Sequence, residues 1–455
     1  MAMDRDAVIW TRAGTAPTRV GRLFVTDTQC RFTYDPDFIR AGLPGLGVLY
    51  PPEFIGTTTI PWDRTSHFNL LPQLQALIPP QGEAGFQRRL VLSYLEQQGL
   101  KPVPGFDSDW QILMVSGHGG IGHLDVFAND TKATEWYGDK VTPALFKISE
   151  GFGFSLKELL TWMDGDAQGI IGALGPTPSV GGAIPKLLLS IPNTGWDGWI
   201  ALPRKGYVEG RTDIVLKFGG SSYPGIVALE ALALDVHREA GFEVPRYWIT
   251  VINGVPAIAI ERYDRTPDGK PIFIESLYSI MATGDKHITH HYSSSFDDIG
   301  RAIDRSPIPI FSDPLDAKKQ LLKRLLLSFA TGNGDMHLEN LAVIRRDGRV
   351  QFSPVYDPTP MRAYSRHDML SVMPFGDYGD IDEKGHPVHV PDGLRRLARN
   401  LGISKKILHG MVEEVLDITN NYIDRVFALK DLPDLNKEQL RKVTARARED
   451  LASVG

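Results

Sequence analysis

The residues with the clearest chemical meaning lie between positions 332 and 357. Asp335 follows a Gly-Asn-Gly tripeptide, Asn340 comes five positions later, and Asp357 stands between a tyrosine and a proline. A loop aspartate can accept the proton of a hydroxyl group, and an asparagine with a second aspartate can bind magnesium through oxygen atoms. This set predicts phosphoryl transfer to a hydroxyl, with Asp335 as the base and Asn340 and Asp357 on the metal.

The segment between Asn340 and Asp357 strengthens this prediction. Two apolar runs over 341–352 meet at an Asp-Gly pair, which predicts a β-hairpin. A base, an asparagine, a hairpin and an aspartate follow one another in this order in protein-kinase sites. Taken singly, Asp335 also suits a helix cap, Asn340 a turn and Asp357 the start of a turn. Their joint order favours a phosphotransferase.

A nucleoside triphosphate further needs backbone amides, a cation and magnesium near its phosphates, so ATP and Mg²⁺ are the expected cofactors. Gly181 and Gly182 permit a close approach of the backbone to a phosphate. Lys217 lies in an apolar strand, where an ammonium group needs an anion, and Glu230 is a candidate to orient it. An ordinary glycine loop, a lysine that reaches water from an edge strand and a solvated glutamate are the simpler alternatives.

Hydrophobic periodicity predicts the elements that would position these residues. Residues 1–110 are expected to form a β-rich module with paired strands at 21–25 and 31–34 and a later helix at 86–95. The segment 111–125 is expected to form a strand, a glycine-rich turn and a second strand, with the strands at 112–115 and 122–124.

The middle of the chain alternates strands with a helix, and the last third is mainly helical. Strands are expected at 187–191, 213–218, 247–252 and 257–261, a helix at about 224–240, and further helices from about 315 to the end. The predicted fold class is α+β, with a protein-kinase-like two-lobed core after the β-rich module. The predicted domains are 1–128, 150–265 with the glycine-rich loop and the ATP lysine, and 266–455 with the catalytic loop.

Composition narrows the class of protein. The chain has 455 residues, of which 42% are apolar and 23% charged, as in globular proteins of several domains. A net charge of -6 argues against nucleic acid or an anionic membrane as the main partner. Cys30 is the only cysteine, and no signal peptide or membrane span stands out, so a cytoplasmic protein is expected.

The chain resembles the HipA-family serine/threonine kinases, the toxin partners of bacterial HipB-type antitoxins. The resemblance extends over nearly the whole chain, and its most specific parts are 332–340 and 261–265. The other matching segments are 179–183 with Lys186, 214–217, Glu230 with Ala240 and Gly241, and 356–357.

This resemblance implies roles for individual residues. Asp335, His337 and Asn340 would form the catalytic loop, with His337 shaping it, and Asp357 would bind magnesium. Lys217 would hold the ATP phosphates, and the segment from Glu261 to Tyr263 would take the adenine. The loop of Ser179, Val180, Gly181, Gly182 and Ala183 would cover the phosphates, and Ser179 would be the autophosphorylated serine. A phosphate on Ser179 would place about two negative charges beside the ATP site and silence the kinase.

The resemblance also implies partners. It points to a protein substrate with a serine or threonine acceptor, such as an aminoacyl-tRNA synthetase, and to a HipB-like DNA-binding antitoxin. No membrane partner is expected, and no direct binding of nucleic acid by this chain alone. A kinase without an antitoxin, a kinase for a small molecule and a catalytically inactive relative that binds a repressor are the alternatives. Lys217 follows Lys186 by 31 positions, and the insertion around 193–199 within this interval would alter the ATP lid.

Two further groups of residues have less specific patterns. His287, His290 and His291 lie near Asp285 with a spacing that suits a metal, although such histidines are more often surface residues. The basic residues of the helix after 315 are expected to form a solvated face, and these are Lys318, Lys319, Lys323 and Arg324.

Overall fold

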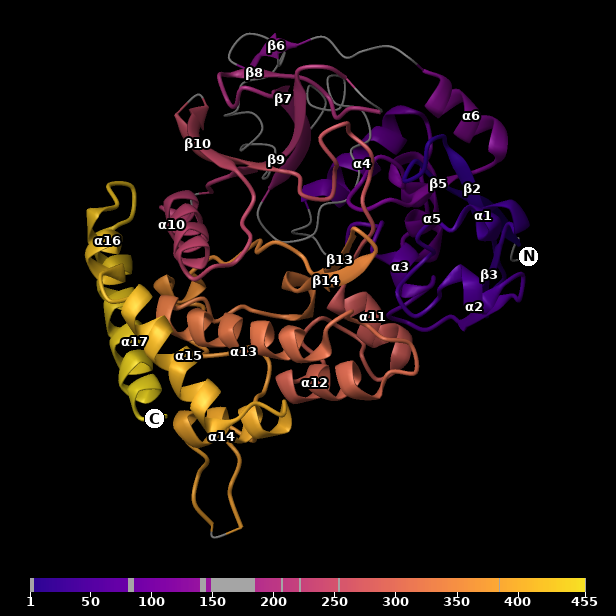
Figure 1. The fold of residues 1–455 in the computed structure, drawn as a ribbon. Helices are drawn as coiled ribbons and strands as arrows, with labels where there is room; N and C mark the ends of the chain where they lie inside the picture. Colours follow the sequence, from indigo (N-terminus) through magenta and orange to yellow (C-terminus); the bar gives the residue numbers. More distant parts are fainter. Residues whose placement is uncertain are drawn as a thin grey trace. The chain divides into compact units, whose positions relative to one another are not determined.

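The computed structural model describes most of the chain, as two compact units (Figure 1). The described residues are 4–80, 86–139, 145–148, 185–205, 208–220, 222–252, 254–383 and 385–454. The first unit is Met1–Gly220 with Arg246–Glu275, and the second is Ser221–Pro245 with Ser276–Gly455. The loop with Ser179, Val180, Gly181, Gly182 and Ala183 lies outside the described residues. The three predicted domain ranges stay a prediction.

The first unit begins with an antiparallel sheet of order β4-β3-β2-β1-β5. The predicted strands at 21–25 and 31–34 are confirmed as parts of β2 and β3, whose register pairs Leu23 with Phe32. The elements of this part are β1 Arg5–Thr11, β2 Thr18–Val25, β3 Gln29–Tyr34, α1 Pro36–Ala41, α2 Pro52–Ile55, β4 Ile60–Asp63, α3 Pro72–Gln75, α4 Phe86–Gln97, α5 Phe106–Ser116, β5 Asp125–Phe127 and α6 Asp130–Gly138.

A second antiparallel sheet, of order β10-β11-β9-β7, completes the core of this unit. Its strands confirm the four predicted in this region, and the apolar residues of β7 and β9 share a core with Leu90 of α4. The helix α4 therefore packs against strands far from it in the sequence. The elements are β6 Phe146–Lys147, β7 Lys186–Pro192, β8 Trp199–Ile200, β9 Arg211–Phe218, β10 Tyr247–Ile252 and β11 Val255–Glu261, followed by β12 Ile274–Ser276 where the two units divide.

The predicted strands at 112–115 and 122–124 are wrong. The first lies inside the helix α5, whose residues Trp110, Ile112 and Leu113 are buried. A short apolar run fits a buried helix as well as a strand, and the upstream carboxylates Asp107 and Asp109 favour a helix start because of the helix dipole. The second predicted strand is a turn, and β5 begins after it.

The second unit is mainly helical, as predicted, and it contains the predicted hairpin as β13 and β14. Much of its helix α13 is buried, and this helix ends at Gly332, the first residue of the Gly-Asn-Gly motif. Its elements are α10 Ile226–Glu239, α11 Leu277–Gly284, α12 Phe296–Arg305, α13 Pro314–Thr331, η1 Leu338–Asn340, β13 Ala342–Arg346, β14 Arg349–Phe352, η2 Met361–Ala363, α14 Val390–Asn400, α15 Lys405–Ile418, α16 Tyr422–Ala428 and α17 Asp434–Ala452. The fold class, α+β with sheet-containing and helical parts, is confirmed.

The expected solvated basic face of α13 is wrong for two of its residues. Lys318 is buried and pairs with Asp304 at 2.7 Å. Arg324 is 5% exposed, and it donates to the Ser353 carbonyl oxygen at 2.8 Å and lies over the ring of Phe242. When neighbouring elements cover a helix, the apolar stems of lysine and arginine pack against those elements, and a planar guanidinium can lie on an aromatic ring. Hydrophobic periodicity alone does not show which basic residues are covered.

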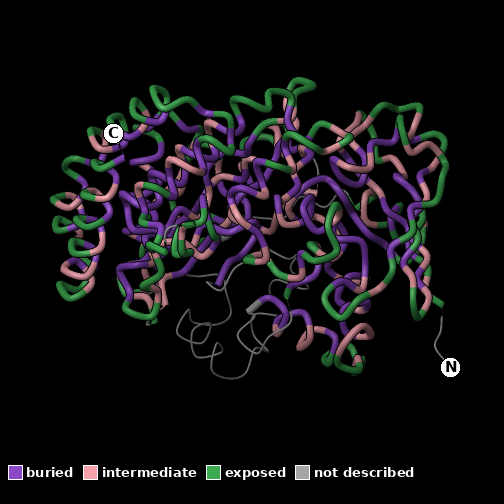
Figure 2. Tube along the Cα trace, turned by 90° about the horizontal axis from the view of Figure 1, so that it is seen from below, coloured by how far each residue is buried: buried purple, intermediate pink, exposed green. Residues whose placement is uncertain are grey.

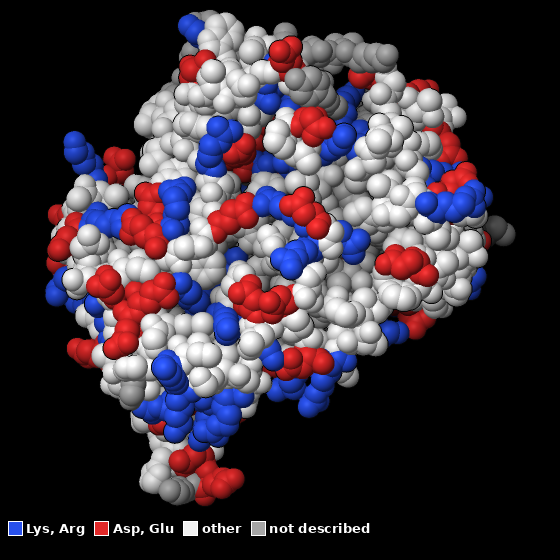
Figure 3. Space-filling model, viewed as in Figure 1, with Lys and Arg blue, Asp and Glu red and all other residues white. Residues whose placement is uncertain are grey.

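The surface has mixed charge. Lys and Arg side chains are interspersed with Asp and Glu over most of the face shown in Figure 3. In Figure 2, buried stretches run through the interior and exposed residues gather on outer turns and loops. No described helix combines the length and the apolar character that a membrane crossing requires.

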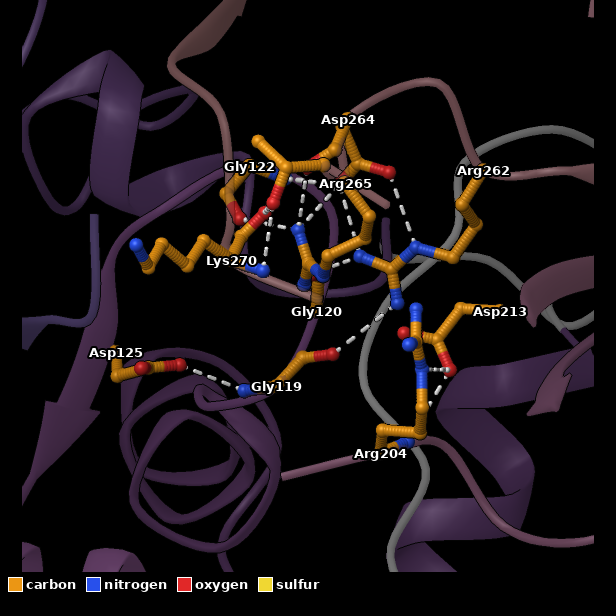
Figure 4. Close-up of polar contacts among 11 residues, drawn as sticks. Gly119, Gly120, Gly122, Asp125, Arg204, Asp213, Arg262, Asp264, Arg265 and Lys270 are labelled. Atoms are coloured by element: carbon orange, nitrogen blue, oxygen red, sulfur yellow. Dashed lines mark hydrogen bonds and ion pairs between the residues drawn. The ribbon is translucent and has the colours of Figure 1, made fainter. Parts of the chain in front are cut away.

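A buried charge network joins the two halves of the first unit (Figure 4). Asp264 accepts two hydrogen bonds from Arg262, at 3.0 and 2.8 Å, and one from Arg265 at 2.8 Å. Its carboxylate also accepts the Gly122 amide at 2.8 Å, and both arginines donate to the carbonyl oxygen of Gly120. The glycine-rich turn after α5 is thereby fixed to the segment that follows β11.

The charges of this network depend on one another. Burial would raise the pKa of Asp264, but Arg262 and Arg265 outweigh it and hold that pKa well below its ordinary value. Burial and the neighbouring Arg262 lower the pKa of Arg265 to about 10, against the attraction of Asp264. A second buried pair, Arg204 with Asp213 at 3.1 Å, lies alongside (Figure 4). Removing one member leaves an uncompensated buried charge.

We expect Asp264→Ala to lower the free energy of unfolding by about 3–5 kcal/mol, because two buried guanidinium groups lose their carboxylate. Urea unfolding monitored by circular dichroism measures this. Asp268→Asn, in the same loop but exposed, is the matched control and should change the stability little. Since the pKa of Asp264 is lowered in the folded chain, its contribution is complete above the ordinary pKa of an aspartate and is lost as the pH falls below it. Equal stability of the two variants would contradict this role.

Candidate functional site

In the first unit, the predicted ATP lysine lies opposite a second lysine. Lys217 of β9 and Lys186 of β7 are directly paired across the two strands, and they are 5% and 4% exposed. Directly opposed residues of neighbouring strands point to the same face, and like charges there repel each other. Two buried ammonium groups on one face therefore make a position that favours an anion.

The predicted adenine segment follows β11 directly. Glu261 ends that strand, and its carboxylate accepts two hydrogen bonds from Arg246, at 2.7 and 2.9 Å. The Arg262 amide donates to the Asp213 carbonyl oxygen at 2.9 Å, and the half-buried Tyr263 lies between the two buried residues of the charge network. The Glu261 side chain and the amides of Glu261 and Arg262 are thus engaged within their own unit.

Glu230 is buried in α10, which excludes the solvated helix position that was its simpler explanation. The helix belongs to the second unit and Lys217 to the first, so the predicted pairing of Glu230 with Lys217 stays a prediction.

In the second unit, two glycines shape the chain before Asp335. Gly332 caps α13 with φ of 77°, and Gly334 has φ of 71°. A Cβ atom on Gly334 would lie 2.7 Å from Cγ of Arg362 and from the Met369 carbonyl oxygen. Between them, the buried Asn333 accepts the Asp335 amide on its Oδ1 at 2.9 Å. The Gly-Asn-Gly tripeptide therefore fixes the backbone that presents Asp335.

Asn340 is tied to Asp335 by its side chain. Its Nδ2 donates to the Asp335 carbonyl oxygen at 2.9 Å. An amide that uses its NH₂ group on the backbone keeps its oxygen as an acceptor. That oxygen, Oδ1, is the atom that a magnesium ion would bind.

Asp357 lies close enough to Asp335 for their charges to interact. Its φ of 50° is in the left-handed region, which is unusual for an aspartate and more so before a proline. The neighbouring Tyr356 donates to the Glu339 carbonyl oxygen at 2.5 Å, which joins this segment to the loop of Asp335. Strained backbone of this kind concentrates at functional sites.

The carboxylate of Asp335 is perturbed by its surroundings. Burial raises its pKa, and the like charge of Asp357 adds to this effect. His367 and the Tyr292 hydroxyl, which is 3.4 Å from Oδ1, oppose it, and the pKa remains raised. Sequence reasoning missed both residues. Tyr292 lies 43 positions before Asp335 and His367 lies 32 positions after it, and neither belongs to a recognisable motif. The only signal near Tyr292 was the group of histidines beside it.

His337 is 9% exposed and begins the short helix η1. Its Nδ1 accepts the Glu339 amide at 3.2 Å, and its ring lies 5.2 Å from that of Tyr292 and 4.3 Å from that of His291. The structure therefore brings together Asp335, His337, Asn340 and Asp357 in one unit. Of the other predicted metal histidines, His287 and His290 are exposed, as surface residues are.

Comparisons with known proteins agree on one family. A family model described as "HipA-like C-terminal domain" matches residues 178–422. A Haemophilus influenzae protein named "Putative kinase" is 22% identical over 300 residues, which cover 62% of this chain and 81% of that protein. "Putative kinase Y4dM" of Sinorhizobium fredii is 26% identical over 264 residues, or 54% of this chain and 58% of that protein, which is less than two thirds of its length.

A solved structure supports the fold. The Shewanella oneidensis MR-1 structure of the toxin–antitoxin system HipA, HipB and its operator DNA is similar with a TM-score of 0.64. The identity is 16%, and the match covers 96% of this chain and 97% of that one. At this identity the likeness concerns the fold, and it confirms the predicted kinase-like class.

We expect Asp335→Asn to raise the melting temperature at pH 7, because the folded chain disfavours the charged form of this carboxyl. A raised pKa in the folded state destabilises the fold only where the group is ionised. The gain should therefore disappear as the pH falls below the ordinary pKa of an aspartate. Differential scanning fluorimetry across pH measures both effects.

Asp347→Asn is the control, since this exposed residue lies in the β13–β14 turn and an Asn-Gly pair also suits such a turn. It should show no gain that depends on pH. A lower melting temperature for Asp335→Asn at pH 7 would mean that the carboxylate stabilises the fold.

Proposed function

The chain belongs to the HipA-like C-terminal domain family, a kinase family, and from this membership we propose that it is an ATP- and Mg²⁺-dependent serine/threonine protein kinase. The observation that carries the proposal is the arrangement around Asp335. Asn340 is oriented by the Asp335 backbone, and Asp357 is close enough to perturb the Asp335 carboxylate. One base with two oxygen donors for a metal is the minimum that phosphoryl transfer to a hydroxyl requires.

In this proposal Asp335 accepts the proton of the acceptor hydroxyl as its oxygen bonds to the γ-phosphorus of ATP and ADP leaves. The raised pKa of Asp335 makes it a better proton acceptor than an ordinary aspartate. The Oδ1 atom of Asn340 and the carboxylate of Asp357 hold magnesium, which neutralises the phosphate charge. His337 keeps the loop in shape by capping η1.

The first unit supplies the nucleotide contacts in this proposal. Lys217, with Lys186 opposite it, binds phosphate oxygens, and Glu230 orients Lys217. The segment from Glu261 to Tyr263 takes the adenine. The glycine-rich loop, residues 179–183, covers the phosphates, and autophosphorylation of Ser179 switches the kinase off.

We further propose that the protein is the toxin of a HipBA-like pair and acts on translation. The solved relative of the same fold is a complex of HipA with HipB and operator DNA. A HipB-like, DNA-binding antitoxin is therefore the expected partner, and an aminoacyl-tRNA synthetase is the expected type of protein substrate. A freestanding kinase would lack a small helix-turn-helix gene beside its own.

We expect Asp335→Ala to reduce phosphoryl transfer by about 10²–10⁴-fold, because the general base is lost. Transfer from labelled ATP to the chain itself and to proteins of a cell extract measures it. Asp316→Ala, an exposed first-turn carboxylate of α13, is the control and should retain the wild-type rate. Wild-type activity in Asp335→Ala would refute the assignment, and an inactive wild-type chain would favour a relative that only binds a repressor.

We expect Asp357→Asn to abolish magnesium-dependent binding of ATP while leaving the fold intact, because a carboxamide binds magnesium much more weakly than a carboxylate. Isothermal titration of ATP with and without Mg²⁺ measures this. Unchanged binding by Asp357→Asn would remove Asp357 from the metal site.

The proposed switch at Ser179 is tested by mass spectrometry of wild type and Ser179→Ala after incubation with ATP. A missing phosphate at Ser179 in wild type would reject the switch.

A further inference from the structure

A second group of potential metal ligands joins the proposed catalytic loop to the segment before it, and its members are His291, His337 and Glu339. One ligand atom from each lies within 4.8 Å of the others. Nδ1 of His291 is 3.4 Å from Oε2 of Glu339, and the rings of His291 and His337 are 4.3 Å apart. The predicted histidine cluster around Asp285 thus contributes a single residue, His291, and two loop residues replace the rest.

The backbone holds the two contributing segments together. The Leu338 amide, between His337 and Glu339 in sequence, donates to the His291 carbonyl oxygen at 3.2 Å. On the other side, the Tyr278 hydroxyl donates to the Thr289 carbonyl oxygen at 3.0 Å. The three side chains therefore converge on a backbone that is already fixed, which lowers the entropy lost when a ligand binds.

The chemistry of these donors selects the ion. Two imidazoles with one carboxylate suit Zn²⁺ and similar transition metals, whereas Mg²⁺ prefers an all-oxygen site. In a tetrahedral site with bonds of about 2.0–2.1 Å the donor atoms are about 3.3 Å apart, so the pair of His291 and Glu339 is near this spacing. Three protein ligands leave the fourth position for water.

We propose that His291, His337 and Glu339 form a binding site for Zn²⁺ or a related transition-metal ion. Neither the family nor the proposed magnesium site accounts for it, because Asn340 and Asp357 supply the oxygen donors of that site. Nδ1 of His337 accepts a hydrogen bond from the Glu339 amide. A metal on Nδ1 would replace this hydrogen bond, and a metal on Nε2 would move the ring proton to Nδ1, which could then no longer accept it. We therefore expect affinity of about micromolar rather than nanomolar strength.

The ion would act on the base through Tyr292. This residue follows His291, its ring lies 4.1 Å from that of His291, and its hydroxyl is 3.4 Å from Oδ1 of Asp335. A metal that fixes His291 to the catalytic loop also fixes Tyr292 against the carboxylate that must meet the acceptor hydroxyl. Zn²⁺ bound here therefore inhibits phosphoryl transfer, an effect that rests on the proposed kinase function, whereas binding does not.

The experiment is a competition for Zn²⁺ between the full chain and a chromophoric chelator, without nucleotide. Wild type should bind one ion with about micromolar affinity, and His291→Ala and Glu339→Gln should each weaken binding at least tenfold. His409→Ala is the matched control, because His409 and Glu413 form another histidine–glutamate pair, at 3.3 Å, on α15. Co²⁺ should give visible absorption bands in wild type that are lost in His291→Ala.

Equal affinity of wild type and His291→Ala, or a loss of binding in His409→Ala instead, overturns the site. The inhibitory effect is tested separately by phosphoryl transfer at rising Zn²⁺ with Mg²⁺ constant. Wild type should lose activity at the concentrations that saturate the chelator assay, and Glu339→Gln should resist at least tenfold more Zn²⁺. Binding without any difference in inhibition between these two proteins overturns the effect on Asp335 and leaves the site.

Discussion

A carboxylate buried between two arginines is the interaction on which the first unit depends. Asp264 pairs with both Arg262 and Arg265, and all three also form hydrogen bonds with the glycine-rich turn after α5. Without that carboxylate, two guanidinium groups would be buried together with no opposite charge between them, which would lower the free energy of unfolding. The network therefore couples the N-terminal module to the end of β11, and it fixes the backbone on either side of Tyr263.

The second unit has the opposite electrostatic arrangement. Asp335 and Asp357 are like charges in proximity, and burial makes the charge of Asp335 more costly. The loop tolerates this because its backbone is fixed by Gly332, Asn333 and Gly334 and by the Asn340 side chain. Among the described residues, the buried carboxylate of Asp264 is thus paired with two arginines, whereas the carboxylate of Asp335 lies near a like charge and has a raised pKa.

Periodicity predicted several of the longer regular elements of the described chain because their apolar faces are long enough to be distinctive. The strands β7, β9, β10 and β11 and the helices α10 and α13 were found in this way. It failed at 112–115, where four apolar residues fit either a buried helix or a strand, and at Lys318 and Arg324, which neighbouring elements cover. Motif order selected Asp335, Asn340 and Asp357, whereas Tyr292 and His367 escaped notice because nothing local distinguishes them.

The sequence by itself determined which residues could do chemistry, since Asp335, Asn340 and Asp357 are recognisable by type, spacing and the hairpin between them. It also permitted the backbone of the loop, because Gly332 and Gly334 can adopt the positive φ angles that other residues rarely take. The tertiary structure alone decided the environment of each charge. Burial raises the pKa of Asp335. The pairing of β7 with β9 places Lys186 opposite Lys217, and the packing of the second unit brings His291 close to Glu339. Electrostatic energies depend on distance and solvent exposure, which follow from packing and not from position in the chain.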